Sequence, residues 1–210
     1  MIRILSIFFN LLYHSFAGSY DAVSWLVSGG RWKDWVRSVL PLIEGETVLE
    51  LGCGTGTLQV ELLKCGIKAF ALDESGNMLR IANKKLASNG VSTAARLLRA
   101  RAEAIPLPTA SFDCLVATFP SEYIFRLETL IHCRRVLKPG GKLIILLGGR
   151  ITGGGIYNQF LRFLYLITGQ STPDIPRMQQ IKVRVESMGF QMQIEQIDLE
   201  QDRLTVMVAM

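Results

Sequence analysis

The sequence predicts an α/β protein, a three-layer sandwich in which helices cover both faces of a mostly parallel sheet. Two observations lead to this prediction. Apolar runs of strand length alternate with amphipathic stretches of helical length from residue 47 to residue 188, and two stretches of alternating apolar and polar residues then close the chain as a hairpin. The seven expected strands therefore form a mostly parallel sheet with one antiparallel strand.

The length and composition suit a single domain. At 210 residues, we expect one domain over residues 1–210, with a helical N-terminal lead-in or cap at 1–45 and a Rossmann-like core at 46–210. Hydrophobic residues make up 49% of the chain, as expected for a parallel sheet buried on both faces. The net charge of +5 is mild, and basic residues do not cluster with aromatic ones, so no nucleic-acid partner is expected.

Cysteine and histidine are sparse. The chain has four cysteines and two histidines: Cys53, Cys65, Cys114, Cys133, His14 and His132. They form no C-x-x-C pair and show no metal-ligand spacing, so no metal site is expected. Free thiols of this kind favour a reducing compartment, and we predict a cytoplasmic protein.

The N-terminal stretch, residues 1–17, is apolar with Arg3 near its start. One interpretation is a secretory signal, because residues 15–17 resemble a cleavage site. The other is an amphipathic helix that covers the active site or lies on a membrane surface, and Asn10 and His14 within the run favour it. The run is too short to span a membrane, so peripheral membrane contact is the expectation that it adds.

The first expected strand, residues 47–51, leads into a loop with glycines at alternate positions. The loop residues are Gly52, Cys53, Gly54, Thr55 and Gly56. A helix follows, and the free N–H groups of its first turn would face any ligand on the loop. Glycines also permit left-handed backbone and close ligand approach. The loop is therefore either a tight strand–helix turn or a cradle for a ligand.

The second expected strand, residues 69–73, favours the cradle. It ends in Asp73, which lies 21 positions after Gly52 (73 − 52). At about this spacing, a second parallel strand delivers a carboxylate to the ribose of a nucleoside. Glu74 follows directly and is included in the same site.

The glycine spacing indicates which nucleoside. A dinucleotide site has G-x-G-x-x-G, whereas position 57 here is Thr57. Glu50, two residues before Gly52, would repel a pyrophosphate but attract a cationic ligand. S-adenosylmethionine, which carries an ammonium and a sulfonium group, fits this pattern.

The stretch E-L-G-C-G-T-G at residues 50–56 resembles the first motif of the class I S-adenosylmethionine-dependent methyltransferases. The phrase R-V-L-K-P-G-G-K-L at residues 135–143 also resembles that family, and the likeness runs from about residue 47 to 210. Within the family, the chain is similar to enzymes of ubiquinone and menaquinone biosynthesis. The resemblance implies S-adenosyl-L-methionine as cofactor and S-adenosyl-L-homocysteine as product.

The resemblance also implies roles for individual residues. Glu50 and the glycine turn would hold the amino-acid end of the cofactor and Asp73 the ribose. Tyr20 resembles the Tyr of a Tyr-Asp pair in the family's lead-in and would close over the cofactor. Met78 would lie against the adenine, although a methionine there equally suits the core.

A helix capped by Ser75 should run to about residue 89 and lead to a third strand at 95–101. The following residues resemble the family's adenine-edge loop, and Ala102 would meet the ring edge. Relatives that methylate quinone precursors usually carry an acid before this alanine, whereas the chain has Arg101. Glu103 either substitutes for that acid or lies on the surface.

A fourth strand is expected at residues 111–118, and residues 118–122 should border the site because ligands bind beyond the carboxyl ends of such strands. Thr118 is the member of this group that we assign to the cofactor. The Asn/Asp-Pro-Pro-Tyr signature of methyltransferases acting on adenine or glutamine amino groups is absent. Those substrates are therefore not expected.

The remaining elements complete the sheet. A helix at 127–136, a fifth strand at 142–147, a helix at 176–188 and strands at 189–199 and 203–209 are expected. Glycines at 148, 149 and 153–155 precede an apolar helix at 156–167. This helix is either a movable flap or a helix buried against the sheet.

Three functions remain open from the sequence. The first is O- or C-methylation of a small lipophilic acceptor, and the second is cofactor binding without catalysis. A nicotinamide-dependent reductase is the third. No catalytic residue is assigned, because methyl transfer needs a base only when the acceptor is protonated. The residues that could serve as one are His14, Tyr20, Glu122 and Tyr123.

Overall fold

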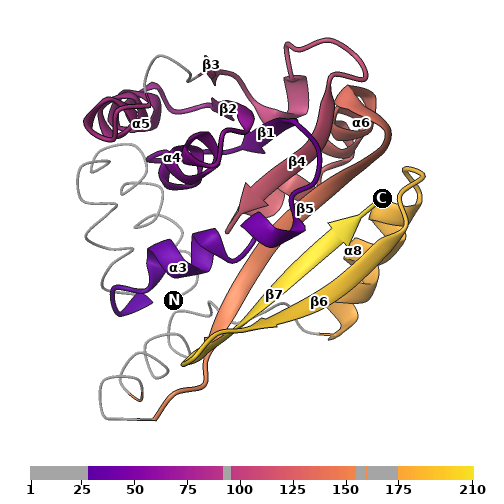
Figure 1. Cartoon of the computed structure of the whole chain (residues 1–210). Coiled ribbons are helices and arrows are strands. Elements are labelled where there is room, and N and C mark those ends of the chain that lie inside the picture. Colours follow the sequence, from indigo (N-terminus) through magenta and orange to yellow (C-terminus); the bar gives the residue numbers. More distant parts are fainter. Residues whose placement is uncertain (1–27, 92–95, 155–158, 160–174) are drawn as a thin grey trace.

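A computed structural model describes residues 28–91, 96–154, 159 and 175–210. Within them, seven strands form one sheet in the order β3-β2-β1-β4-β5-β7-β6 (Figure 1). The strands are β1 (Thr47–Leu51), β2 (Lys68–Asp73), β3 (Arg96–Arg99), β4 (Phe112–Thr118), β5 (Leu137–Ile151), β6 (Met192–Asp198) and β7 (Asp202–Ala209). The helices are α3 (Trp32–Arg37), α4 (Thr57–Lys64), α5 (Gly76–Ser88), α6 (Leu127–Val136) and α8 (Ile175–Glu186). Short 3-10 turns η2 (Leu40–Leu42), η4 (Ala102–Ala104) and η5 (Glu122–Phe125) lie between them.

The pairing confirms the predicted fold class. Strands β1 to β5 pair in parallel, whereas β7 pairs antiparallel with both β5 and β6. The sheet is therefore mostly parallel with β7 as its one antiparallel strand among the described residues. The carboxyl ends of β1, β2 and β4 consequently lie at the same edge, where a ligand site forms in folds of this type.

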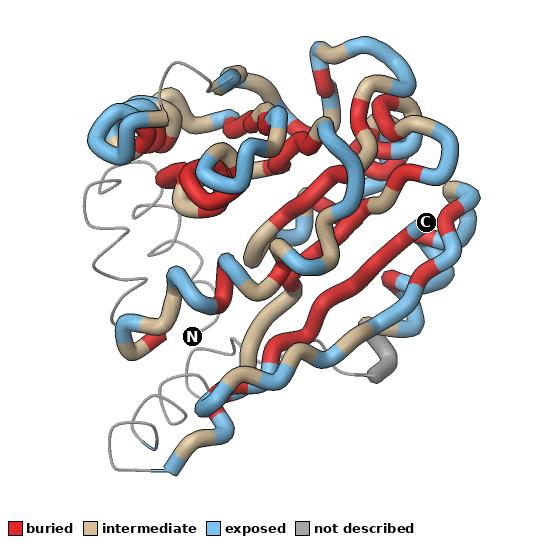
Figure 2. Tube along the Cα trace, viewed as in Figure 1, coloured by how far each residue is buried: buried red, intermediate tan, exposed pale blue. Residues whose placement is uncertain are grey.

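Alternate residues of β1 face opposite layers. Leu49 and Leu51 belong to the apolar core that includes α6 and α8, whereas Val48 packs with the core formed by α3 and α4. Figure 2 shows buried chain running through the central strands of the sheet. Glu50 shares the face of Val48, because side chains alternate along a strand. A carboxylate is thereby placed within an apolar layer, directly before the glycine loop.

Helix α3 is tied to the sheet by buried polar contacts. The indole Nε1 of Trp35 donates to Asp202 Oδ2 at 2.8 Å, and Arg31 forms an ion pair with the same carboxylate. On the other side, Arg37 donates to Glu61 of α4 at 2.7 Å. These contacts stabilise the lead-in across the sheet and fix α3 beside the carboxyl end of β4.

The fifth strand is longer than predicted. We expected residues 142–147, but β5 runs from Leu137 to Ile151. Gly148 and Gly149, expected above as loop residues next to the apolar helix at 156–167, instead pair with Thr205 and Leu204 of β7 beyond a register shift. The prediction was wrong for these two glycines, because the long partner strand supplies hydrogen bonds that the local sequence does not reveal.

Several predictions concern residues that are not described. The apolar N-terminal run, His14, Tyr20 and the helix expected at 156–167 lie outside the described residues, apart from residue 159. In the part of the chain that the structure describes, no helix is long and apolar enough to cross a bilayer.

Candidate functional site

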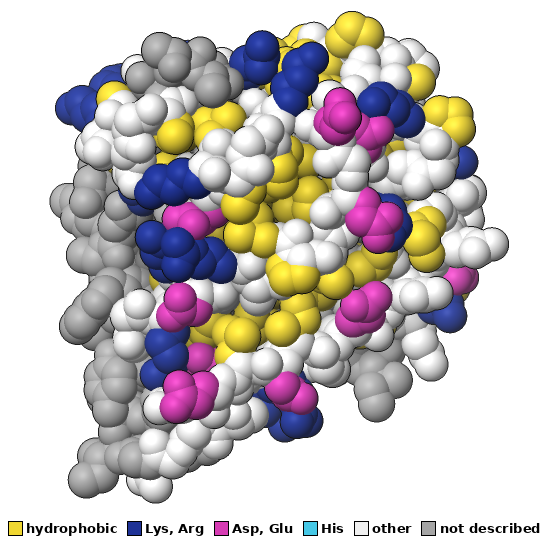
Figure 3. Space-filling view, in the orientation of Figure 1, with side chains coloured by type: hydrophobic (Ala, Val, Ile, Leu, Met, Phe, Trp, Pro, Cys, Tyr) yellow, Lys and Arg dark blue, Asp and Glu magenta, His cyan; other side chains and the backbone are white. Residues whose placement is uncertain are grey.

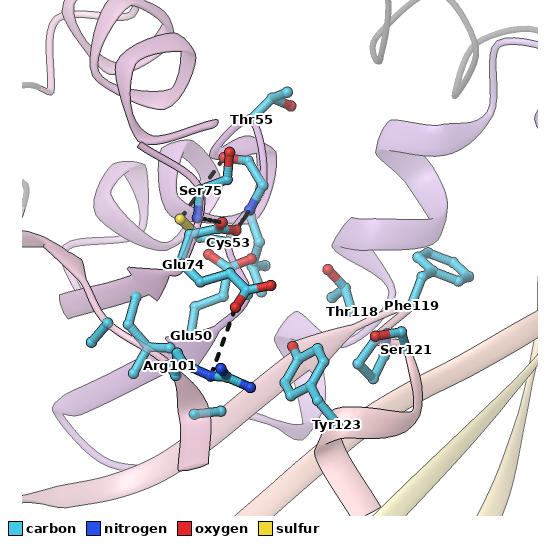
Figure 4. A pocket seen from close by; sticks show the side chains of 18 of the residues that line it. Glu50, Cys53, Thr55, Glu74, Ser75, Arg101, Thr118, Phe119, Ser121 and Tyr123 are labelled. Carbon is cyan, nitrogen blue, oxygen red and sulfur yellow. Dashed lines mark hydrogen bonds and ion pairs between the residues drawn. The ribbon is translucent and has the colours of Figure 1, made fainter. Parts of the chain in front are cut away.

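A cavity of about 440 Å³ opens at the carboxyl ends of β1, β2 and β4. Its walls come from the glycine loop, the start of α5, η4, the segment after β4 and helix α3. Most of the predicted cofactor residues line it: Glu50, Gly52, Cys53, Gly54, Thr55, Asp73, Glu74, Ala102, Glu103 and Thr118. Figure 4 shows how the side chains of many of these residues surround one space.

The glycine loop needs its glycines for different reasons. Gly52, Gly54 and Gly56 all have positive φ, at 71°, 51° and 78°. A Cβ at Gly54 would meet no atom within 4 Å, so the backbone there borders open space. A Cβ at Gly56 would instead lie 2.9 Å from the Cβ of Ala82 in α5. Gly54 therefore keeps the loop accessible, whereas Gly56 lets two helices pack closely.

Asp73 ends β2 and is held by the loop that it faces. Its Oδ2 accepts from the Gly54 N–H at 2.9 Å, and its Oδ1 accepts from the Ser75 N–H at 2.8 Å. Burial raises the pKa of Asp73, while these two backbone donors oppose the rise. The carboxylate is thus fixed in orientation at the wall of the cavity, with further acceptor capacity on each oxygen.

Glu50 is the most deeply buried acid of the site, with 1% of its surface exposed. Its Oε2 accepts from Gln59 Nε2 of α4 at 2.9 Å. Burial raises the pKa of Glu50 to about 8, and the nearby charge of Asp73 acts in the same direction. A cationic ligand would offset both effects, because an adjacent positive charge favours the ionised carboxylate.

Charged side chains at the mouth of the cavity pair with one another. Glu103 accepts from Arg126 at 2.6 Å and from Arg101 at 3.3 Å, and Arg101 also lies 3.8 Å from Glu74. Burial opposes ionisation of Glu103, but its hydrogen bonds, including those from the two arginines, bring its pKa below the usual range. Glu103 is therefore an ionised carboxylate at the rim, with Arg101 and Arg126 as its partners.

Three predicted cofactor residues do not line the cavity as described. Met78 is fully buried in α5 among the core residues, which supports the alternative that it fills the core. Gly56 packs against Ala82, as noted above. Tyr20 lies outside the described residues.

The opposite wall of the cavity is aromatic. Trp32 of α3 and Phe119 after β4 both line it, and their ring centroids lie 4.5 Å apart. Trp35 continues the cluster at 6.0 Å from Phe119. Phe119 has φ of 50°, a left-handed conformation that is uncommon for a bulky residue. Backbone strain of this kind collects at functional sites, and here the tryptophan rings hold the strained residue in place.

Sequence reasoning found only part of this aromatic wall. Residues 118–122 were expected to border the site, and Phe119, Pro120 and Ser121 do line the cavity. Trp32 and Val36 of the lead-in were missed, because no local pattern shows which face of α3 reaches the sheet. Of the proposed bases, Tyr123 lines the cavity, whereas Glu122 is exposed and does not.

The residues present fit a cationic nucleoside such as S-adenosylmethionine. Two buried carboxylates, Glu50 and Asp73, face a cavity whose loop is open above Gly54. The arginines that line it, Arg101 and Arg126, are paired with acids at its mouth. Oxygen acceptors in the interior and arginines at the rim suit a ligand whose positive charge lies deep.

Comparisons with known proteins agree with this geometry. A family model described as a methyltransferase domain matches residues 48–141. The chain is 33% identical over 142 residues to the ubiquinone/menaquinone biosynthesis C-methyltransferase UbiE of Marinomonas sp. (strain MWYL1). This match covers 64% of the chain and 57% of that relative, so the chain spans little more than half the length of the curated protein.

Solved structures share the fold at low sequence identity. Phosphoethanolamine N-methyltransferase 2 of Haemonchus contortus, in complex with S-adenosyl-L-methionine, aligns with a TM-score of 0.65 and 14% identity over 95% of this chain and 59% of that one. The [4+2]-cyclase SpnF aligns with a TM-score of 0.60 and 17% identity over 85% and 80% of the two chains. At such identities, these structures show the shared fold alone.

The fold and the glycine loop with its two acids define a nucleoside-binding α/β domain. The matching family model and the curated relatives agree with this class of domain. Over these matched residues the chain is similar to the class I S-adenosylmethionine-dependent methyltransferases.

Proposed function

We propose that the protein transfers a methyl group from S-adenosylmethionine to a carbon or oxygen atom of a small lipophilic acceptor. One observation carries the cofactor part of this proposal: Glu50 and Asp73 place two buried carboxylates at the wall of the same cavity. Such a wall favours a cation, beside which Glu50 ionises, over a pyrophosphate, which would keep Glu50 protonated and be repelled by Asp73. It therefore favours S-adenosylmethionine over a nicotinamide dinucleotide.

The side of the cavity formed by residues 50–55 and 73–75 is called the polar wall below. Its residues have distinct expected tasks. Asp73, oriented by Gly54 and Ser75, would accept hydrogen bonds from the ribose hydroxyls. Glu50 and the glycine loop would hold the amino-acid end, and Ala102 with Glu103 lies where the adenine edge is expected. Thr118, at the carboxyl end of β4, borders the space between this wall and the aromatic one.

When bound, S-adenosylmethionine supplies an activated methyl group for in-line attack by the acceptor, and S-adenosylhomocysteine leaves. The protein then contributes mainly by holding the two reactants in line and excluding water. Trp32, Val36 and Phe119 supply an apolar surface for the acceptor. Because most of this surface is hydrocarbon and aromatic ring, a lipophilic acceptor would bury area favourably there.

The relatives support a finer version of the acceptor. UbiE is named for ubiquinone and menaquinone biosynthesis and for C-methylation. A quinone-type acceptor methylated at carbon is consistent with the aromatic wall and needs no dedicated base if the acceptor ionises in solution. We therefore place quinone precursors first in the panel of acceptors to be tested.

A non-catalytic cofactor-binding protein is the alternative. Two observations favour it: Arg101 replaces the usual acid, and Glu103 is engaged with two arginines instead of facing the adenine position alone. The SpnF structure also shows that this fold accommodates a protein named for a cyclisation. These features are compatible with binding of the cofactor without methyl transfer.

Turnover assays separate the two functions. The full chain is incubated with S-adenosylmethionine and a panel of quinone precursors, phenols and lipids, and S-adenosylhomocysteine is quantified. Formation above that of an Asp73→Ala control supports the enzyme. Tight cofactor binding without product across the whole panel supports the non-catalytic alternative.

The cellular location belongs to the same proposal. We infer a cytoplasmic protein that reaches lipophilic acceptors through peripheral membrane contact of its apolar N-terminal residues 1–17. Flotation of the full chain with anionic lipid vesicles tests this contact. A version lacking residues 1–17 should stay unbound if the inference holds.

A further inference from the structure

Tyr123 lies against the glycine loop although it is 71 positions away from Gly52 in sequence (123 − 52). Its hydroxyl donates to the backbone carbonyl of Leu51, the last residue of β1, at 3.1 Å. A Cβ on Gly52 would overlap the same hydroxyl. The phenol oxygen is thus seated directly on the loop that forms the floor of the cofactor site.

The position of this hydroxyl is fixed from its own side as well. Tyr123 belongs to η5, and its backbone carbonyl accepts from the Thr129 hydroxyl of α6 at 2.7 Å. Thr129 is fully buried, so this turn is anchored in the core. Figure 4 shows the Tyr123 ring directed with its hydroxyl into the cavity, on the side of Thr118 and Ser121.

Tyr123 therefore joins the two walls of the cavity. Its backbone follows β4 in the segment that supplies Phe119 to the aromatic wall, whereas its hydroxyl rests on Gly52 of the polar wall. Next to it, the loop is open above Gly54. In the proposed reaction the methyl group passes from one wall to the other, and this hydroxyl stands where they meet.

We propose that the Tyr123 hydroxyl oxygen contacts the sulfonium end of S-adenosylmethionine and distinguishes the charged methyl donor from the uncharged thioether product. This inference rests on the proposed cofactor and adds a residue that the sequence suggested only as a base. A phenol that donates its proton still has oxygen lone pairs that attract a cation. A thioether lacks the positive charge and gains much less from the same oxygen.

The same geometry argues against Tyr123 as a general base. Its proton is donated to a backbone carbonyl, which cannot accept it permanently. The residue acts instead on the position and charge of the donor. Its loss should therefore change the affinity ratio between donor and product, which a purely structural tyrosine would leave unchanged.

Calorimetric titration of the full-length Tyr123→Phe variant with S-adenosylmethionine and with S-adenosylhomocysteine tests the proposal. We expect the affinity for S-adenosylmethionine to fall ~10-fold, as for loss of one hydrogen-bonding group near a charge, and the affinity for S-adenosylhomocysteine to change by less than ~2-fold. Thermal unfolding of the variant verifies that it is folded.

Thr129→Val is the matched control. It removes the hydrogen bond to the Tyr123 carbonyl but keeps the phenol, so it should change both affinities by a similar factor. A Tyr123→Phe variant with unchanged affinities, or with equal losses for both ligands, would refute the contact. Failure of the wild-type chain to bind either ligand would instead refute the proposed cofactor.

Discussion

The two walls of the cavity differ in chemistry and in how the chain builds them. The polar wall comes from residues 50–55 and 73–75, which lie at the carboxyl ends of two adjacent parallel strands and directly after them. The aromatic wall combines Trp32 and Phe119, which are 87 positions apart in sequence (119 − 32). Local sequence thus specifies the wall that we propose for the cofactor, whereas tertiary packing creates the wall that we propose for the acceptor.

The buried charges of the cavity also lie on one of its two walls. In Figure 3, basic and acidic side chains are interspersed over much of the visible face. Within the cavity, by contrast, Glu50 and Asp73 are buried on the polar wall. If this division is functional, substitutions on one wall should change cofactor affinity and substitutions on the other should change acceptor use.

Removing the carboxylate of Asp73 should have the largest effect. We expect Asp73→Ala to weaken S-adenosylmethionine binding ~100-fold, because it removes charged acceptors for the ribose and releases the Gly54 and Ser75 N–H groups. Calorimetry measures this loss. Asp198→Ala, on an exposed hairpin carboxylate paired with Arg203, is the control and should bind normally. An Asp73→Ala affinity within threefold of wild type would contradict the assigned role.

Substitution of two glycines in the same loop should affect different properties, stability at Gly56 and cofactor affinity at Gly54. Gly56→Ala forces a Cβ against Ala82 at φ of 78° and should lower the free energy of unfolding by ~2–3 kcal/mol. Gly54→Ala meets open space and should cost only ~1 kcal/mol, but its methyl group would enter the cavity and weaken S-adenosylmethionine binding ~30-fold. Urea unfolding and calorimetry on both variants measure the two effects. If the two variants were equally stable and lost the same affinity for S-adenosylmethionine, Gly54 would not border the ligand.

On the aromatic wall, Trp32→Ala should spare the cofactor. The ring lines the cavity and stacks near Phe119, so its removal should lower kcat/KM for a lipophilic acceptor ~10-fold through KM. The dissociation constant of S-adenosylmethionine should stay within ~2-fold of the wild-type value. Steady-state kinetics with the best acceptor of the panel measure both. A weakened cofactor with unchanged acceptor kinetics would reverse the assignment of the walls.

The smallest expected effect is a pH dependence of cofactor binding. Burial raises the pKa of Glu50 to about 8, so the free protein holds a proton there at neutral pH. A bound ammonium group favours the ionised form, and binding should release this proton. Affinity should therefore rise as pH increases toward 8, by about fivefold from pH 7 to pH 8 for one linked proton.

Calorimetry in buffers of different ionisation enthalpy detects the released proton, and Glu50→Gln should abolish it. The contribution of Glu50 to the free energy of unfolding changes with pH in the opposite direction to the cofactor affinity. A folded-state pKa above the unfolded value contributes stability that is complete below the unfolded pKa and is lost as pH rises through about 8. Unfolding free energy that increases across this range would contradict a buried, protonated Glu50.

The sequence anticipated elements whose signals are local. Thr47–Leu51 was predicted as the first strand with its observed bounds, and Ser75 caps α5 by accepting from the Met78 N–H as expected. The carboxylate of Asp73 was also placed at the end of its strand. Each depends on a few neighbouring residues whose chemistry decides the backbone.

What escaped prediction depends on partners far along the chain. The extension of β5 through Gly148 and Gly149 requires β7, and the place of Trp32 requires the contact between Trp35 and Asp202. The contact between the Tyr123 hydroxyl and Gly52 joins η5 to the glycine loop. No short pattern encodes such contacts, because they arise only when the layers pack.

Calorimetric titration of the wild-type chain with S-adenosylmethionine, beside a parallel titration with NADH, tests the central claim most directly. The account predicts saturable binding of one S-adenosylmethionine per chain, with proton release at pH 7 and no binding of NADH. Saturable binding of NADH without any binding of S-adenosylmethionine would contradict it.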